Sequence, residues 1–209
     1  MLPNRNYKSE EILAYELGYR FYPEKNFFLD IAGFYNNYHD LLDLETEDPF
    51  IDRNPFPRLV IPIRQKNEMF GHTYGTEISL KWKVTRRWKL SAGYTWLKLQ
   101  LHSHLSTDRY KDRERSDPEN QFHLRSYLNL PWNIEFDSAL YYVDHIGRWD
   151  IPSYVRLDAR LGWKPTKNMN VSIVLQNLLD DHHPEYDTEQ GYVSTEVERS
   201  IYLKMTWQF

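Results

Sequence analysis

The sequence predicts an all-β protein, namely an antiparallel transmembrane β-barrel of which about nine strands are present. Three observations favour this fold class: apolar and polar residues alternate with a period of two, short turns alternate with long polar connections, and tryptophans gather near the short turns. The bulk composition hides this pattern, because 27% of the 209 residues are charged and the mean hydropathy is -0.73. No apolar run approaches the roughly 18–20 residues of a membrane-spanning helix, so a helical membrane protein is excluded.

Nine segments carry the alternation, and we expect each to be a strand. They lie at 11–22, 27–45, 65–84, 88–101, 120–130, 134–144, 154–164, 169–176 and 196–209. The seventh shows the pattern clearly, with Val155, Leu157, Ala159, Leu161 and Trp163 on one parity and Arg156, Asp158 and Arg160 on the other. Successive side chains of a strand point to opposite faces, so each segment has one apolar face and one charged face.

The connections between these segments alternate in length. Short turns are expected at 23–26, 85–87, 131–133 and 165–168, and long polar connections at 46–64, 102–119, 145–153 and 177–195. All short turns therefore lie at one end of the sheet and all long connections at the other. This asymmetry is typical of transmembrane β-barrels, which have short periplasmic turns and long extracellular loops.

The tryptophans support the same interpretation. Those close to a short turn or to the last residue are Trp82, Trp88, Trp132, Trp163 and Trp207. Indole side chains prefer the membrane–water interface, so these residues are expected to form the periplasmic aromatic girdle. Part of the outer girdle would come from Tyr35, Tyr38, Tyr94, Trp96 and Tyr142.

Parity alone does not say which face points inward. The apolar sets contain too many large side chains to fit inside a nine-stranded barrel, and segments of this length match what crosses a bilayer with tilt. The apolar face is therefore expected to meet lipid and the charged face to line a lumen. The candidate lumen residues are Glu77, Arg125, Arg156, Asp158 and Arg160. A soluble ligand-binding β-barrel, which would reverse the two faces, is the alternative.

The sequence carries no sign of catalysis or of a resident cofactor. With 0 cysteines it has no disulfide or thiolate site, and it contains no nucleophile-elbow, zinc-protease or phosphate-loop motif, so no catalytic residue and no cofactor are expected. A net charge of -4 gives no basic field for nucleic acid. The histidine pairs His102/His104 and His182/His183 lack a carboxylate or cysteine partner at set spacing. We interpret them as polar loop surface rather than as metal ligands.

Several stretches resemble the C-terminal part of TonB-dependent outer-membrane receptors. They include Tyr15–Arg20, Gly33–Tyr38, Tyr74–Glu77, Leu90–Trp96, Tyr154–Asp158, Leu161–Trp163, Gln176–Asp180 and His183–Tyr186, in this order over nearly the whole chain. The alternating last segment with Trp207 and Phe209 resembles the signal that such barrels present to their assembly machinery. Asn177, within one of these stretches, is expected to end its strand in a turn stabilised by its side chain.

The resemblance implies a 22-stranded barrel with an N-terminal plug domain, located in the bacterial outer membrane. Such receptors import ferric siderophores or similar scarce ligands with energy from the TonB complex. Residues 1–209 would be the C-terminal portion of the barrel, about nine strands, with the plug and signal peptide absent. An odd strand count and a start without an apolar leader favour the same conclusion. Its expected partners are the plug and remaining strands, TonB through the missing part, the assembly machinery, lipid, lipopolysaccharide and a ferric chelate.

Candidate ligand-binding residues lie in the outer connection at 102–119. They are Arg109, Tyr110, Arg113 and Arg115, which offer charge-assisted hydrogen bonds and stacking to an anionic ferric chelate. The alternative is a solvated loop that binds lipopolysaccharide phosphates or nothing. A proline-rich connection at 46–64 is a second candidate on the ligand side. At the level of the whole protein, the alternatives are a passive porin-like or adhesive barrel and a non-functional receptor fragment.

Overall fold

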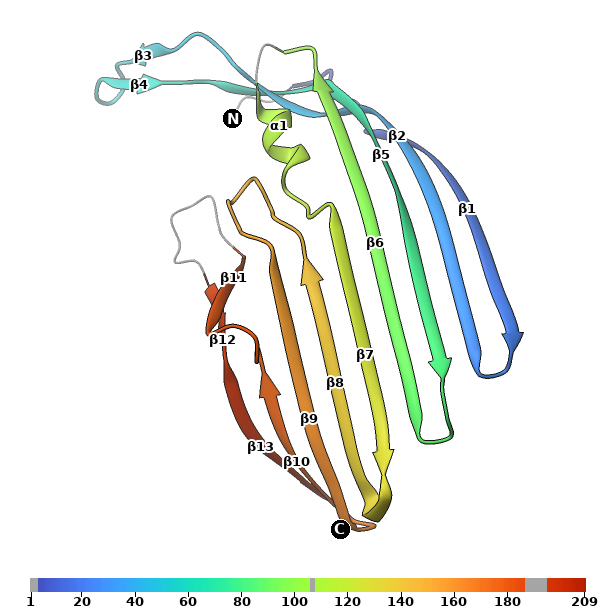
Figure 1. Ribbon diagram of the computed structural model, residues 1–209. Coiled ribbons are helices and arrows are strands. Elements are labelled where there is room, and N and C mark those ends of the chain that lie inside the picture. Colours follow the sequence, from blue (N-terminus) through green and yellow to red (C-terminus); the bar gives the residue numbers. More distant parts are fainter. Residues whose placement is uncertain (1–3, 106–107, 187–194) are drawn as a thin grey trace. The chain divides into compact units, whose positions relative to one another are not determined.

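A computed structural model describes residues 4–105, 108–186 and 195–209 of the chain. Nine strands form one sheet in the order β1–β2–β5–β6–β7–β8–β9–β10–β13, which confirms the predicted all-β, nine-stranded architecture (Figure 1). Their bounds are β1 (Glu11–Glu24), β2 (Phe27–Thr46), β5 (Ile63–Lys83), β6 (Trp88–Ser103), β7 (Asn120–Leu130), β8 (Ile134–Val143), β9 (Tyr154–Thr166), β10 (Met169–Gln176) and β13 (Ser200–Trp207). Among the described residues, no helix is long and apolar enough to cross a membrane.

The chain divides into two compact units. Unit 1 comprises residues 1–15, 34–74 and 98–114, and unit 2 comprises residues 16–33, 75–97 and 115–209. Unit 1 contains a small hairpin of β3 (Phe50–Asp52) and β4 (Arg58–Val60) and the single-turn helix α1 (Arg109–Glu114). Its interior holds Met69 and Asp43, both almost fully buried.

Each long connection carries local structure that the sequence did not predict. The β3–β4 hairpin lies in 46–64, α1 lies in 102–119, an isolated bridge joins Ile146 to Ile151 in 145–153, and β11 (His182–Tyr186) lies in 177–195. Residues 106–107 and 187–194 of these connections lie outside the described residues. A 3-10 turn, η1 (Pro131–Asn133), forms the short connection between β7 and β8.

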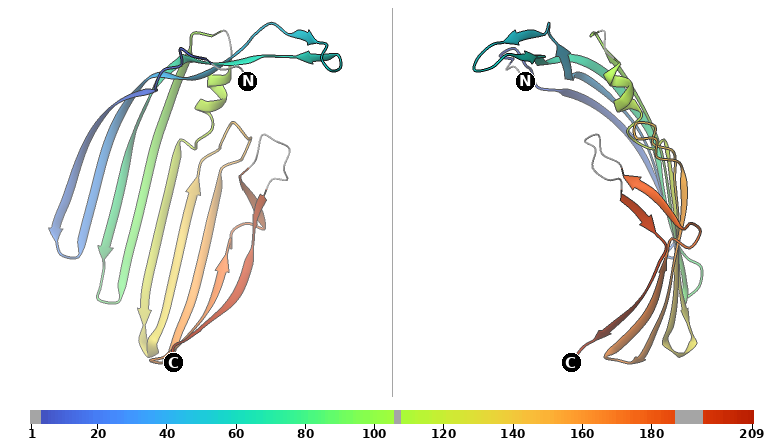
Figure 2. Two further views of the ribbon diagram at one scale, coloured as in Figure 1. Left: turned by 180° about the vertical axis from the view of Figure 1, so that it is seen from behind. Right: turned by 90° about the vertical axis from the view of Figure 1, so that its left-hand side faces the viewer.

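The expectation of one continuous last strand over 196–209 was wrong. The chain breaks at Arg199, so β12 (Thr195–Glu198) pairs with β11 while β13 pairs with β10. The backbone amide of Arg199 donates to the Asp181 carbonyl at 2.9 Å, outside the ladder of the large sheet. The alternating segment is therefore split into two strands because its two parts pair with different strands. The β11–β12 hairpin lies beside the end of β10 (Figure 2).

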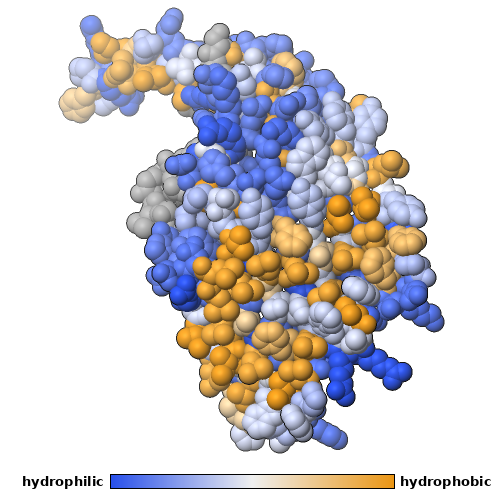
Figure 3. Space-filling model, viewed as in Figure 1, coloured by the Kyte–Doolittle hydropathy of each residue, from blue (hydrophilic) through white to orange (hydrophobic). Residues whose placement is uncertain are grey.

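The register in unit 2 places apolar side chains in continuous rows across four strands. Phe136 of β8 is paired with Leu161 of β9, Leu161 with Ile173 of β10, and Ile173 with Leu203 of β13. These residues remain 40 to 69% exposed, and Figure 3 shows the apolar side chains gathered over this part of unit 2. Soluble monomers rarely expose an apolar surface of this extent, so the face needs an apolar environment.

Candidate functional site

The face of unit 2 opposite the apolar rows is charged, and around Arg160 its charges are paired across strands. Arg160 of β9 donates to Asp137 at 2.7 Å and to Glu135 at 3.1 Å, both on β8, and the Lys164 ammonium also contacts Glu135. Asp137 and Arg160 are direct partners in the β8–β9 register, so the sheet itself aligns the pair. We call this surface the charged face.

Tyr141 of β8 joins two arginines on the charged face. The Arg125 guanidinium lies 5.7 Å from the centre of the Tyr141 ring, and the Arg156 guanidinium lies 5.8 Å from it. Tyr141 is the register partner of Arg156, which explains the second contact. Both distances allow cation–π attraction, so the ring reduces the mutual repulsion of two like charges.

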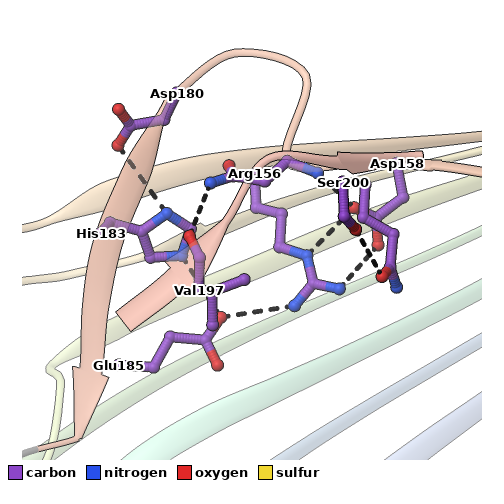
Figure 4. A network of polar contacts seen from close by, with 9 residues as sticks. Arg156, Asp158, Asp180, His183, Glu185, Val197 and Ser200 are labelled. Atoms are coloured by element: carbon purple, nitrogen blue, oxygen red, sulfur yellow. Dashed lines mark hydrogen bonds and ion pairs between the residues drawn. The ribbon is translucent and has the colours of Figure 1, made fainter. Parts of the chain in front are cut away.

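Arg156 also anchors the β11–β12 hairpin to the sheet (Figure 4). Its guanidinium donates to the two carboxylate oxygens of Asp158 at 3.0 and 2.9 Å and to Glu185 of β11 at 3.4 Å. The Arg156 and Asp158 side chains are only 22% and 19% exposed. Arg156 and Asp158 are two residues apart and so share one face of β9, where solvent screens their attraction only in part.

His183 of β11 is buried against the same anchor. Its ring stacks on Tyr154 with centroids 4.2 Å apart, and its nitrogens lie 3.7 Å from Asp180 and 3.3 Å from Glu185. The interpretation of His183 as polar loop surface was therefore wrong, because stacking on Tyr154 leaves it 3% exposed. Sequence reasoning missed this residue, although it belongs to the stretch His183–Tyr186 that carries the family resemblance.

Asn177 ends β10 and completes the anchor, with its backbone in the left-handed region at φ 53°. Its backbone amide donates to Asp158 at 3.1 Å and its side-chain amide donates to the Val197 carbonyl of β12 at 3.0 Å. The residue is fully buried. We call Arg156, Asp158, Asn177, His183 and Glu185 the hairpin clamp, because together they tie β11 and β12 to β9 and β10.

The other histidines lie elsewhere. In unit 1, the rings of His102 and His104 pack against Phe70 at 5.5 and 4.9 Å, and His182 is exposed on β11. Across residues 4–105, 108–186 and 195–209, no group of three or more His, Cys, Asp or Glu side chains is arranged to hold a metal ion.

The four candidate ligand-binding residues do not form one cluster within a unit. Arg109, Tyr110 and Arg113 lie on α1 of unit 1, whereas Arg115 belongs to unit 2. Arg113 points into unit 1, since its guanidinium donates to the Leu42 carbonyl at 3.1 Å. Arg109 and Arg115 are exposed, so a role in ligand binding stays a prediction for them and for Tyr110.

Glu77 lines a hollow of about 510 Å³ on the charged face of unit 2. The hollow also contains the ion pair of Arg20 with Asp30, at 2.8 Å. His123 lies over Gly93 here, and a Cβ atom at Gly93 would come within 2.3 Å of the His123 ring. The absence of a side chain at Gly93 therefore makes room for the His123 imidazole, and both residues line the hollow.

Asp52 and Asp144, which lie outside the nine strands of the large sheet, have lowered pKa values. The backbone amide of Asn54 and the Arg58 guanidinium hold the pKa of Asp52 below its ordinary value in the β3–β4 hairpin. The side-chain amide of Asn120, 2.9 Å away, holds the pKa of Asp144 below its ordinary value just after β8. Hydrogen bonds to the ionised carboxylate favour the charged form, so both groups are ionised near neutral pH.

The residues of the predicted periplasmic girdle and assembly signal are exposed. Trp132, Trp163 and Trp207 are 84%, 52% and 67% exposed, and Phe209 is fully exposed. Trp88 is partly covered, because its indole N–H donates to the Ser126 hydroxyl at 3.0 Å. The role of Trp207 and Phe209 in assembly stays a prediction.

Comparison with known proteins matches residues 1–178 to the family described as "TonB dependent receptor-like, beta-barrel". The probable TonB-dependent siderophore receptor PiuA of Acinetobacter baumannii is 27% identical over an alignment of 150 residues, and the match covers 65% of this chain and 20% of PiuA. The ferric-catecholate import receptor Fiu of Escherichia coli superposes with a TM-score of 0.71 at 19% identity, covering 97% of this chain and 28% of Fiu. The ferric enterobactin receptor PfeA of Pseudomonas aeruginosa gives 0.73 at 14% identity, covering 99% of this chain and 32% of PfeA. The chain thus spans a fifth to a third of these relatives.

Proposed function

Because the chain belongs to the TonB-dependent receptor-like β-barrel family, we propose that it forms part of the transmembrane barrel of an outer-membrane receptor. This receptor imports a ferric siderophore or a similar scarce metal chelate with energy from the TonB complex. Residues 1–209 supply the C-terminal portion of the barrel, and a plug domain fills the lumen. The proposed role is binding and transport rather than catalysis.

One structural observation carries the proposal: the sheet of unit 2 has two incompatible faces. The row from Phe136 to Leu203 is apolar and exposed, which suits lipid, while the face with Arg160 and Asp137 is charged and internally paired, which suits an aqueous or protein-filled lumen. A wide barrel satisfies both faces at once. The names of PiuA, Fiu and PfeA support iron chelates as the ligand class.

Uptake of radioiron tests the proposal directly. Cells that carry the gene and cells from which it has been deleted are supplied with a panel of ferric siderophores, with and without a protonophore. We expect at least one chelate to be taken up only when the gene is present and only when the inner membrane is energised. A protonophore should abolish this uptake, since TonB acts through the proton gradient.

Two results would contradict this function. Unchanged uptake of every ferric chelate after deletion would remove the transport role. Gene-dependent entry of small solutes that a protonophore does not affect would instead identify a passive, porin-like barrel. Loss of the gene product from the outer-membrane fraction would contradict the proposed location.

A further inference from the structure

A second hollow on the charged face of unit 2, of about 400 Å³, lies beside two of the short turns. Its lining includes Tyr22, Phe28, Lys81, Lys83, Lys89 and Tyr127, and also Phe27, Trp82 and Leu90 of the opposite parity; we call it the lysine hollow. Lys25 of the neighbouring turn also reaches it. In the proposed barrel this face borders the lumen, and import of a chelate by itself assigns the hollow no specific occupant.

Aromatic rings make the apolar part of the lysine hollow. The rings of Tyr22 and Phe28 contact each other with centroids 4.7 Å apart, and the Lys81 ammonium lies 5.7 Å from the centre of the Phe28 ring. Tyr127 is the register partner of Lys89, so the sheet places an aromatic ring beside a second ammonium group. Such a site accepts an apolar group and an anion at neighbouring positions.

The charge around the hollow is strongly one-sided. Residues 22–28 and 81–91 carry six cations, namely Lys25, Lys81, Lys83, Arg86, Arg87 and Lys89, against the single acid Glu24. Within the described part of the chain, neither Lys83 nor Lys89 forms an ion pair. Two other cations of the charged face differ, because Arg20 and Arg160 pair with carboxylates of neighbouring strands. Lysines that form no ion pair, on the same face as arginines that do, point to an anionic occupant of the hollow.

The spacing of the lysines favours an extended polypeptide as that occupant. Lys81 and Lys83 are two residues apart on β5, which separates their Cα atoms by about 6.6–6.8 Å. Carboxylates at alternate positions of an extended chain have the same separation. Lipid is the less suitable occupant, because Lys81, Lys83 and Lys89 belong to the charged face, although Phe27, Trp82 and Leu90 of the opposite parity also contribute to the lining.

We propose that the lysine hollow binds an acidic polypeptide segment in extended conformation, with carboxylates of alternate residues on Lys81 and Lys83. A large apolar side chain of the same segment enters the space beside the rings of Tyr22 and Phe28. The inference concerns a binding surface and does not depend on which chelate is transported.

A peptide series tests this inference on the full chain folded in detergent micelles. The probe is fluorescein-labelled Glu-Ser-Glu-Ser-Phe-amide, measured by fluorescence polarisation. Matched peptides carry Gln or Lys in place of Glu, or Ser in place of Phe. We expect the acidic peptide to bind about tenfold more tightly than the Gln peptide, to weaken with salt, and to lose affinity when Phe is replaced.

Substitutions in the protein complete the test. The double variant Lys83→Glu and Lys89→Glu should lose the acidic peptide and gain the Lys peptide, which a merely structural defect would not produce. The matched control, Lys8→Glu with Lys167→Glu, changes net charge equally away from the hollow and should leave binding unchanged. If charge reversal prevents folding, Lys83→Gln with Lys89→Gln must still reduce acidic-peptide affinity.

Three outcomes would overturn the proposal. The first is equal affinity for the acidic and Gln peptides. The second is a loss of affinity in the control double variant as large as in the Lys83→Glu and Lys89→Glu variant. The third is displacement of the peptide by short-chain phosphatidylglycerol at a concentration much lower than that of the peptide, which would identify a lipid site. Because the readout is peptide binding, its failure is distinguishable from a failure of iron uptake.

Discussion

Placing arginine on each face of unit 2 gives the sharpest test of its orientation. Leu161 lies in the middle of β9, is 50% exposed, and is paired with Phe136 and Ile173. If this face meets lipid, Leu161→Arg puts a cation near the bilayer midplane, which costs about 2–4 kcal/mol in outer-membrane barrels. The methylene groups of arginine retain part of the contact with both neighbours, so we expect a net loss of about 3 kcal/mol.

Gln121→Arg is the matched control, because Gln121 is exposed on the charged face and lines the hollow of about 510 Å³. Its effect should stay within about 0.5 kcal/mol, as for surface substitutions elsewhere. Both variants are folded into lipid vesicles, and guanidinium unfolding is followed by tryptophan fluorescence. Equal losses in the two variants, or a larger loss for Gln121→Arg than for Leu161→Arg, would refute the assignment of the faces.

Three further predictions concern polar contacts. Arg156→Met should lower the free energy of unfolding by about 2–3 kcal/mol, since Asp158 loses two charge-assisted hydrogen bonds in a mostly buried site. Adding Asp158→Asn should restore part of this stability. Additive losses of the two substitutions in guanidinium unfolding would argue against the pairing. Asn177→Ala should cost about 2 kcal/mol and speed amide exchange in β11 and β12, whereas unchanged exchange would separate Asn177 from the hairpin. Because folding lowers the pKa of Asp144, this carboxylate stabilises the folded state fully above its ordinary pKa near 3.8, and the stabilisation is lost as pH falls through the lower pKa of the folded state. Asn120→Ala should flatten the dependence of the unfolding free energy on acid pH. An unchanged pH profile would contradict the role of Asn120.

The strands could be predicted from the sequence because alternation is a local property. A residue such as Leu161 or Arg160 is assigned to a face by its neighbours two positions away, with no knowledge of the fold. The break at Arg199 could not be predicted in this way. Residues on both sides of it continue the same alternation, and only the choice of partner, β11 or β10, separates β12 from β13.

The contacts of the candidate site are likewise of two kinds, those that a local pattern predicts and those that it does not. Arg156 and Asp158 share one face of β9 two residues apart, so parity already predicts their contact. Burial of His183 depends on Tyr154, which is 29 positions away in sequence, and no local pattern reports such a contact. The role of Arg113 on α1 was equally inaccessible, because its partner Leu42 lies on β2, 71 positions away in sequence. Side chains in long connections are positioned by contacts that sequence spacing does not contain.

The distribution of paired and unpaired charge on unit 2 has a consequence for what can occupy the proposed lumen. Around Arg160 the face is neutralised by its own carboxylates, so a partner there gains little from charge and meets a rigid, prearranged surface. At the lysine hollow, Lys83 and Lys89 form no ion pair with any described residue, so a partner gains most by bringing carboxylates to that end. The hairpin clamp lies where β9 begins, at the end of the long connections, and the lysine hollow lies at the end of the short turns. An acidic segment in the proposed lumen is therefore oriented by electrostatics at the short-turn end. At the other end, the hairpin clamp holds β11 and β12 through contacts within this chain and needs no such segment.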